Sequence, residues 1–119
     1  MNTPPKITVA NVRKGLLRDH NLHLYCGRGK AWPATIGANI GNPFRMKNQS
    51  EVERNRICDE YHEMLLGQPD HPHMKIIQRM ALRLHEGKSI ALYCFCAPKR
   101  CHCDSIRSFA LAEAEKLKD

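Results

Sequence analysis

The pattern of apolar and polar positions along the chain predicts a mixed arrangement of strands and helices. The strand segments, which are rich in β-branched residues or continuously apolar, are 7–12, 23–26 and 89–95. The helical segments, in which apolar residues recur three or four positions apart, are 50–67, 70–87 and 104–118. The last strand is apolar almost without alternation, which is typical of a central parallel strand covered on both faces. We therefore predict one α/β domain over 1–119, a mostly parallel sheet of three or four strands flanked by about three helices.

Local signals mark the ends of the predicted helices. Ser50 and Glu53 form a capping-box pattern that favours a helix start at this point. Gly67 can adopt the left-handed conformation that ends this helix, and a second helix opens near Pro72 and ends at Gly87. The connection between these two helices is therefore a short polar turn.

Two segments lack a regular pattern. Residues 1–5 contain two prolines and predict a flexible tail. Residues 27–49 are rich in glycine, proline and asparagine, and a loop of this length in a compact domain is commonly functional or disordered. Its apolar residues, including Trp32, Ile40 and Phe44, favour an ordered pocket wall. The same aromatic residues could stack on a base or form a small core for the loop itself.

Composition narrows the function classes. Nineteen Lys and Arg against twelve Asp and Glu give a net charge of +7, which favours polyanionic partners such as nucleic acid or nucleotides. The basic residues are scattered, so a generally solvated basic surface is the alternative. No apolar run approaches the ~20 residues of a membrane span, and the N-terminus lacks the apolar core of a signal peptide. The expected location is the cytoplasm. In that compartment six cysteines are more typical of free thiols, metal ligands or redox groups than of a disulfide framework.

The densest chemistry lies between the last predicted strand and the last helix. Four cysteines, together with Lys99, Arg100 and His102, occupy ten residues there: Cys94, Cys96, Cys101 and Cys103. Unpaired amides at a helix N-terminus and nearby cations lower thiol pKa values. Cys101 and His102 are therefore the candidate catalytic pair, and Asp104 is a candidate helix cap or partner of His102.

Other interpretations of this cluster remain open. Zinc could be bound by Cys94, Cys96, Cys101 and Cys103, although both pairs are Cys-x-Cys and structural zinc sites usually space the first pair as Cys-x2-4-Cys. No metal is favoured on this ground, and the cofactor stays unassigned. A phosphatase-like loop from Cys94 to Arg100 would lack internal glycines, and Pro98 removes one amide. The cysteines could also be small buried core residues.

Three separated motifs resemble a known family. They are Gly27-Arg28-Gly29, then Ile40-Gly41-Asn42-Pro43-Phe44, then Cys94-x-Cys96-x-Pro98-x-x-Cys101-His102. In this order they are similar to an uncharacterised domain-of-unknown-function family of tailed phages and bacteria, over about residues 5–112, and the last motif is weakly similar to a second uncharacterised bacterial family. Cys103 and Arg100 depart from the first family's usual residues, which argues against a zinc site or phosphatase loop common to that family. The resemblance supplies no settled activity.

The resemblance implies that the three motifs converge. If the strands that precede the first and third motifs are parallel, both motifs lie at the carboxyl edge of the sheet, where α/β proteins bind ligands. Arg28 would then bind a phosphate or carboxylate, or simply be a surface arginine in a turn. The candidate ligand-binding residues are Gly27, Arg28, Gly29, Asn42, Pro43, Phe44, Cys96, Pro98 and Lys99.

We therefore expect a protein that binds a phosphorylated, nucleotide-like small molecule, with thiol- or His-assisted catalysis as an extension. The alternatives are a nucleic-acid-binding or host-interaction protein without enzymatic activity, and a zinc-stabilised structural domain. If a phage encodes the chain, the compartment is the host cytoplasm. The sequence makes no prediction of oligomeric state.

Overall fold

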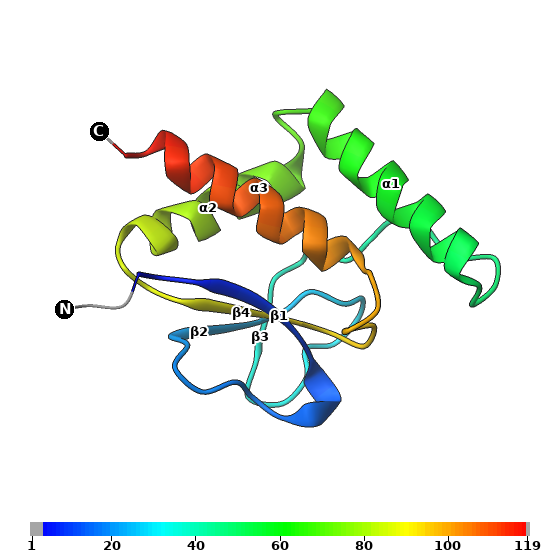
Figure 1. Ribbon diagram of the computed structural model, residues 1–119, viewed down its shortest axis with the longest axis horizontal. Helices are drawn as coiled ribbons and strands as arrows, with labels where there is room; N and C mark the ends of the chain where they lie inside the picture. The colour runs from blue at the N-terminus through cyan, green and yellow to red at the C-terminus, as the bar shows by residue number, and fades with distance from the viewer. Residues whose placement is uncertain (1–3, 119) are drawn as a thin grey trace.

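The computed structural model describes residues 4–118 as one layer of helices on a parallel sheet (Figure 1). Its strands are β1 (Ile7–Asn11), β2 (Leu22–Tyr25), β3 (Ile36–Gly37) and β4 (Ile90–Cys94). Its α-helices are α1 (Glu51–Gly67), α2 (Pro72–His85) and α3 (His102–Lys116), and Val12–Lys14 form a single 3-10 turn. The predicted α/β class, the small parallel sheet and the three helices are confirmed.

The sheet has the order β1-β4-β2-β3, and every neighbouring pair is parallel. Ile90 of β4 is level with Ile7 of β1 and with Leu22 of β2, so the three longer strands start and end together. Their carboxyl ends therefore meet at one edge of the sheet. The prediction that the loops after β2 and β4 share this edge is confirmed.

Each face of β4 packs against a different part of the chain. Ile90, Leu92 and Cys94 join the main core with the buried sides of the three helices, which all cover the same face of the sheet (Figure 1). Ala91 and Tyr93 face the other way and pack with Val12 and other residues of the connecting segments. All five residues of β4 are buried, as expected for a central strand.

The helix ends follow the predicted signals with two changes. Ser50 is the N-cap of α1, and its hydroxyl accepts a hydrogen bond from the Glu53 amide at 3.2 Å. The Glu53 carboxylate does not complete the capping box, because it accepts from the Lys47 amide at 2.7 Å and pairs with Arg56. Gly87, at φ +93, follows α2 as predicted. The prediction for Gly67 is wrong: Gly67 is the last residue of α1 and does not have a positive φ, and Gln68 is the C-cap.

Three regions differ from the sequence expectations or extend them. The long loop 27–49 contains a two-residue strand, β3, where we expected only irregular backbone. Helix α3 begins at His102, two residues before the predicted start, because Cys101 is its N-cap. Residues 1–3 of the expected tail lie outside the described residues. Within residues 4–118 no helix is long and apolar enough to cross a membrane.

Candidate functional site

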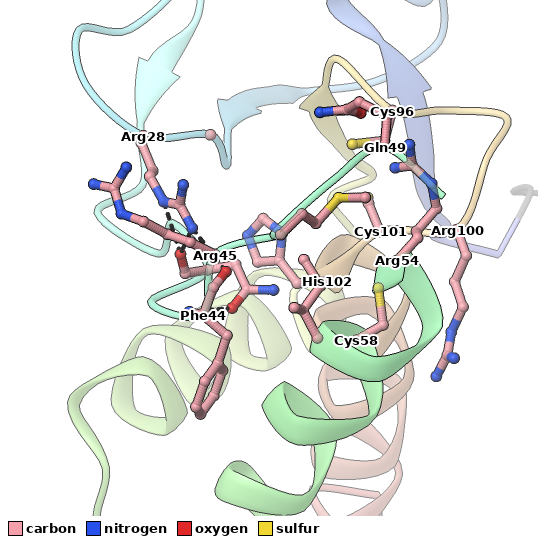
Figure 2. A pocket seen from close by; sticks show the side chains of 14 residues that line it. Arg28, Phe44, Arg45, Gln49, Arg54, Cys58, Cys96, Arg100, Cys101 and His102 are labelled. Carbon is pink, nitrogen blue, oxygen red and sulfur yellow. Dashed lines mark hydrogen bonds between the residues drawn. The ribbon is translucent and has the colours of Figure 1, made fainter. Parts of the chain in front are cut away.

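A pocket of about 330 Å³ opens at the carboxyl edge of the sheet (Figure 2). Its walls come from three segments: the loop after β2, the N-terminal half of α1, and the loop that joins β4 to α3. Arg28, Asn42 and His102, which we expected to share one site, all line it. A concave site of this kind, at the end of parallel strands, is where α/β proteins commonly bind small molecules.

Arg28 holds the pocket loop in place. Its guanidinium donates from Nε and Nη2 to the Asn42 carbonyl, at 2.8 and 2.5 Å, and from Nη2 to the Phe44 carbonyl at 2.8 Å. Figure 2 shows these bonds as dashed lines between Arg28 and the loop. Two of its three nitrogens are therefore engaged by backbone, and Arg28 shapes the wall that a ligand would meet.

The other motif residues of this loop also have structural roles. The Asn42 side chain accepts a hydrogen bond from the Phe44 amide at 2.9 Å, which closes a tight turn around Pro43. A Cβ atom at Gly27 would collide with the Tyr25 hydroxyl, so only glycine allows the backbone to pass there. Together these contacts give a long loop a defined conformation.

His102 connects the first turn of α3 to two separate loop segments. Its Nε2 donates to the carbonyls of Cys26, at 3.0 Å, and Ile40, at 2.9 Å. Because both partners are carbonyls, Nε2 carries the proton and Nδ1 is the free nitrogen. Burial lowers the pKa of His102, which favours the neutral ring. His102 therefore fixes the pocket wall, and its Nε2 is already occupied.

A group of buried thiols lies directly behind this wall. The Sγ atoms of Cys94, Cys101 and Cys103 lie within 4.8 Å of one another, and Cys101 is 3.3 Å from Cys94. The Cys101 thiol, which donates a hydrogen bond to the Cys94 sulfur, lowers the pKa of Cys94. The three thiols are free and close enough to bind one metal ion together.

Arg54 is the feature of this site that sequence reasoning missed. It is 8% exposed, and it is the one side chain with a permanent charge that is buried within residues 4–118. It lines the pocket, and in Figure 2 it extends from α1 toward Gln49 and Cys96. No carboxylate of the described residues lies within 4.0 Å of its guanidinium. A mostly buried arginine without an ion-pair partner among the described residues is unusual, because burial removes part of the solvation of its charge.

The sequence did contain a signal for Arg54. It precedes Ile57, Cys58, Tyr61 and Leu65 at the spacing of one helix face, and all five are buried. An arginine at a core position of an amphipathic helix is unusual.

The other basic residues near the pocket are exposed. Arg45 lies at its rim, whereas Arg100 points outward along α1, where it pairs with Asp59 at 2.8 Å and donates to Asn55 at 3.2 Å (Figure 2). Lys99 lines a neighbouring hollow that Arg54 and Arg100 also border. Positive charge therefore surrounds the pocket on the side of α1.

The structure gathers most of the predicted site residues. Those that line the pocket are Gly27, Arg28, Asn42, Phe44, Cys96, Cys101 and His102. Those that do not line it are Gly29, Pro43, Pro98, Lys99, Cys94 and Cys103. Asp104 accepts a hydrogen bond from the Cys101 amide at 3.2 Å, so of its two predicted roles it takes that of a helix cap.

Comparison with known proteins gives one match. The model of the family described as Domain of unknown function (DUF4326) matches residues 9–112, which cover most of the chain. No curated protein and no solved structure matches. The match confirms the resemblance to an uncharacterised family.

Proposed function

Because the chain belongs to the DUF4326 family, whose description states no activity, we propose a function from the pocket itself: binding of a phosphorylated, nucleotide-like small molecule. The observation that carries the proposal is Arg54, a residue that is 8% exposed, lines the pocket and has no carboxylate partner among residues 4–118. Phosphate oxygens match a guanidinium in both charge and geometry. A bound phosphate would supply the partner that the folded chain does not.

The surroundings of Arg54 support a small ligand. The pocket volume of about 330 Å³ lies within the range of small-molecule sites. Arg45 at the rim adds a second positive charge, and the Gln49 side chain contributes an amide that can recognise a base or a sugar. The backbone held by Arg28 and His102 keeps this wall in one conformation, which reduces the ordering cost of binding.

Catalysis would be an extension of this binding function. Cys101 and Cys96 both line the pocket, so a thiol is available to a bound ligand. His102 would act as a positioning residue, since its Nε2 is engaged by two carbonyls. In this proposal a reaction would therefore depend on Cys101 and require His102 only to hold the loop.

A thermal-shift panel tests the binding function. The panel contains inorganic phosphate, nucleoside mono-, di- and triphosphates, and sugar phosphates, and titration calorimetry follows each stabilising compound. At a concentration 100 times its Kd, a ligand adds about 2.7 kcal/mol of stability. We expect at least one compound to stabilise the protein, and the Arg54→Met variant to lose this effect.

Arg56→Met is the matched control, because Arg56 is on the same helix but pairs with Glu53 and Glu60 outside the pocket. The proposal fails if no compound stabilises the protein, or if the Arg54→Met variant responds like the wild type. Salt-dependent binding to DNA or RNA that is unchanged by Arg54→Met would favour the nucleic-acid-binding alternative instead.

A further inference from the structure

Three buried thiols converge between two elements that hold them rigidly. Cys94 is the last residue of β4, Cys101 is the N-cap of α3, and Cys103 is in the first turn of that helix. All three are buried, at 4%, 5% and 0% exposure. Their positions are therefore set by the central strand and the helix that packs on it.

The spacing of the three thiols fits a tetrahedral metal ion. Zinc binds thiolate at about 2.3 Å, which places neighbouring sulfur atoms about 3.8 Å apart in a tetrahedron. The observed Sγ atoms all lie within 4.8 Å of one another, with 3.3 Å between Cys94 and Cys101.

A fourth thiol is available from the loop between β4 and α3. Cys96 is half-buried and follows Cys94 by two residues. The loop itself is anchored, because the Asn11 side chain donates to the carbonyls of Phe95, at 3.3 Å, and Ala97, at 3.0 Å. Cys96 is therefore the candidate for a fourth ligand beside the three convergent thiols.

We propose that Cys94, Cys101 and Cys103, with Cys96 as the fourth ligand, form a zinc site that forms the back wall of the pocket. Binding releases the thiol protons, so four thiolates with Zn²⁺ carry a net charge of −2. Cys96 and Cys101 also line the pocket, so the metal would fix the same wall that a ligand contacts. Metal content tests this site independently of anion binding. Zinc ligation would exclude the thiol-assisted catalysis considered above, because it would occupy the Cys96 and Cys101 thiols that line the pocket.

The first test measures metal in the full chain, purified under reducing conditions without chelator. We expect about one zinc per chain, and less than about 0.2 zinc per chain overturns the proposal if the reduced protein also fails to bind added Co²⁺. A cobalt derivative should show intense thiolate-to-metal charge transfer and the visible bands of a tetrahedral site. In a second preparation without reductant, a count of four free thiols instead of six in denatured, metal-free protein, with the disulfide mapped by peptide analysis to Cys94 and Cys101, would also overturn it.

Variants then test the ligand set. The Cys103→Ser variant should lose the metal, whereas Cys96→Ser should retain it at least tenfold more weakly, with the charge-transfer band reduced by about a quarter. Cys58→Ser is the control, because Cys58 is a buried cysteine that lines the same pocket from α1 but is not one of the three convergent thiols. It should bind cobalt like the wild type.

Cys96 is on a loop, so its variant stays informative even if Cys103→Ser does not fold. Full charge-transfer intensity in Cys96→Ser would contradict Cys96 as the fourth ligand. A reduced intensity in Cys58→Ser would contradict the assigned site.

Discussion

Replacing Arg54 by methionine should stabilise the protein while it removes ligand binding. Methionine keeps the apolar length of the side chain that packs on α1 and removes the guanidinium. In the absence of ligand the Arg54 residue is 8% exposed, and its guanidinium has no carboxylate partner among residues 4–118. Burial of the Arg54 charge therefore lowers the stability of the ligand-free protein, and the methionine variant removes this effect.

The structure also limits how large the gain can be. Replacing buried ionic groups by apolar residues is neutral or stabilising by about 1–4 kcal/mol. No fully buried side-chain nitrogen or oxygen of the described residues lacks a hydrogen-bond partner, so the Arg54 nitrogens still meet water in the pocket. We therefore expect the free energy of unfolding of Arg54→Met to rise by about 1 kcal/mol, the low end of this range, which corresponds to a rise in Tm of about 4 °C.

Urea unfolding and calorimetry of the wild type, Arg54→Met and Arg56→Met would check this. Arg56→Met removes surface ion pairs to Glu53 and Glu60, so its Tm should fall slightly. A fall in Tm of several degrees in Arg54→Met would contradict the claim that the Arg54 charge destabilises the ligand-free protein. It would mean that Arg54 balances charge inside the fold, with the neighbouring thiolates as the first candidates.

Two further predictions concern histidines. The His102→Ala variant leaves the Cys26 and Ile40 carbonyls without their donor, so its free energy of unfolding in urea should be lower by about 2–4 kcal/mol. A decrease below about 1 kcal/mol would contradict the role of His102 in holding the loop. Burial lowers the pKa of His73 from 6.5 to about 4, and its Nδ1 accepts the Tyr61 hydroxyl at 2.9 Å, with His71 and His102 nearby. Because the pKa of His73 is lower in the folded than in the unfolded protein, the stability that neutral His73 contributes is complete above pH 6.5 and is lost as pH falls toward 4. The Tm of the wild type should therefore fall across this range, and that of His73→Gln should fall less. Equal slopes in the two proteins would contradict this role of His73.

Much of the fold could be predicted because its signals are local. The apolar run of β4, the Ser50 cap and Gly87 after α2 each mark an element through neighbouring residues. The prediction that the loops after β2 and β4 lie at the same edge of the sheet required only that the two strands be parallel, and they are. The order β1-β4-β2-β3 could not be predicted, because pairing between distant strands leaves no local pattern.

The site was less predictable because side-chain roles depend on distant contacts. Arg28 and His102 were correctly placed at the pocket, but the carbonyls that engage them come from other segments. Arg54 was missed because its burial and its lack of a carboxylate partner among residues 4–118 can be seen only in the three-dimensional structure. The Cys-x-Cys spacing argued against zinc, yet the strand end and the helix cap bring three of these thiols together.

The central claim is that Arg54 binds an anion in the pocket, and side-chain NMR tests it most directly. Protein with ¹⁵N label would be titrated with nucleoside monophosphates and inorganic phosphate while the Arg54 Nε–H signal is followed. The account predicts a saturable shift of this signal, together with the Gln49 and Cys96 amides that line the same pocket. An Arg54 signal that stays unchanged while exposed lysines and arginines shift without saturation would contradict it.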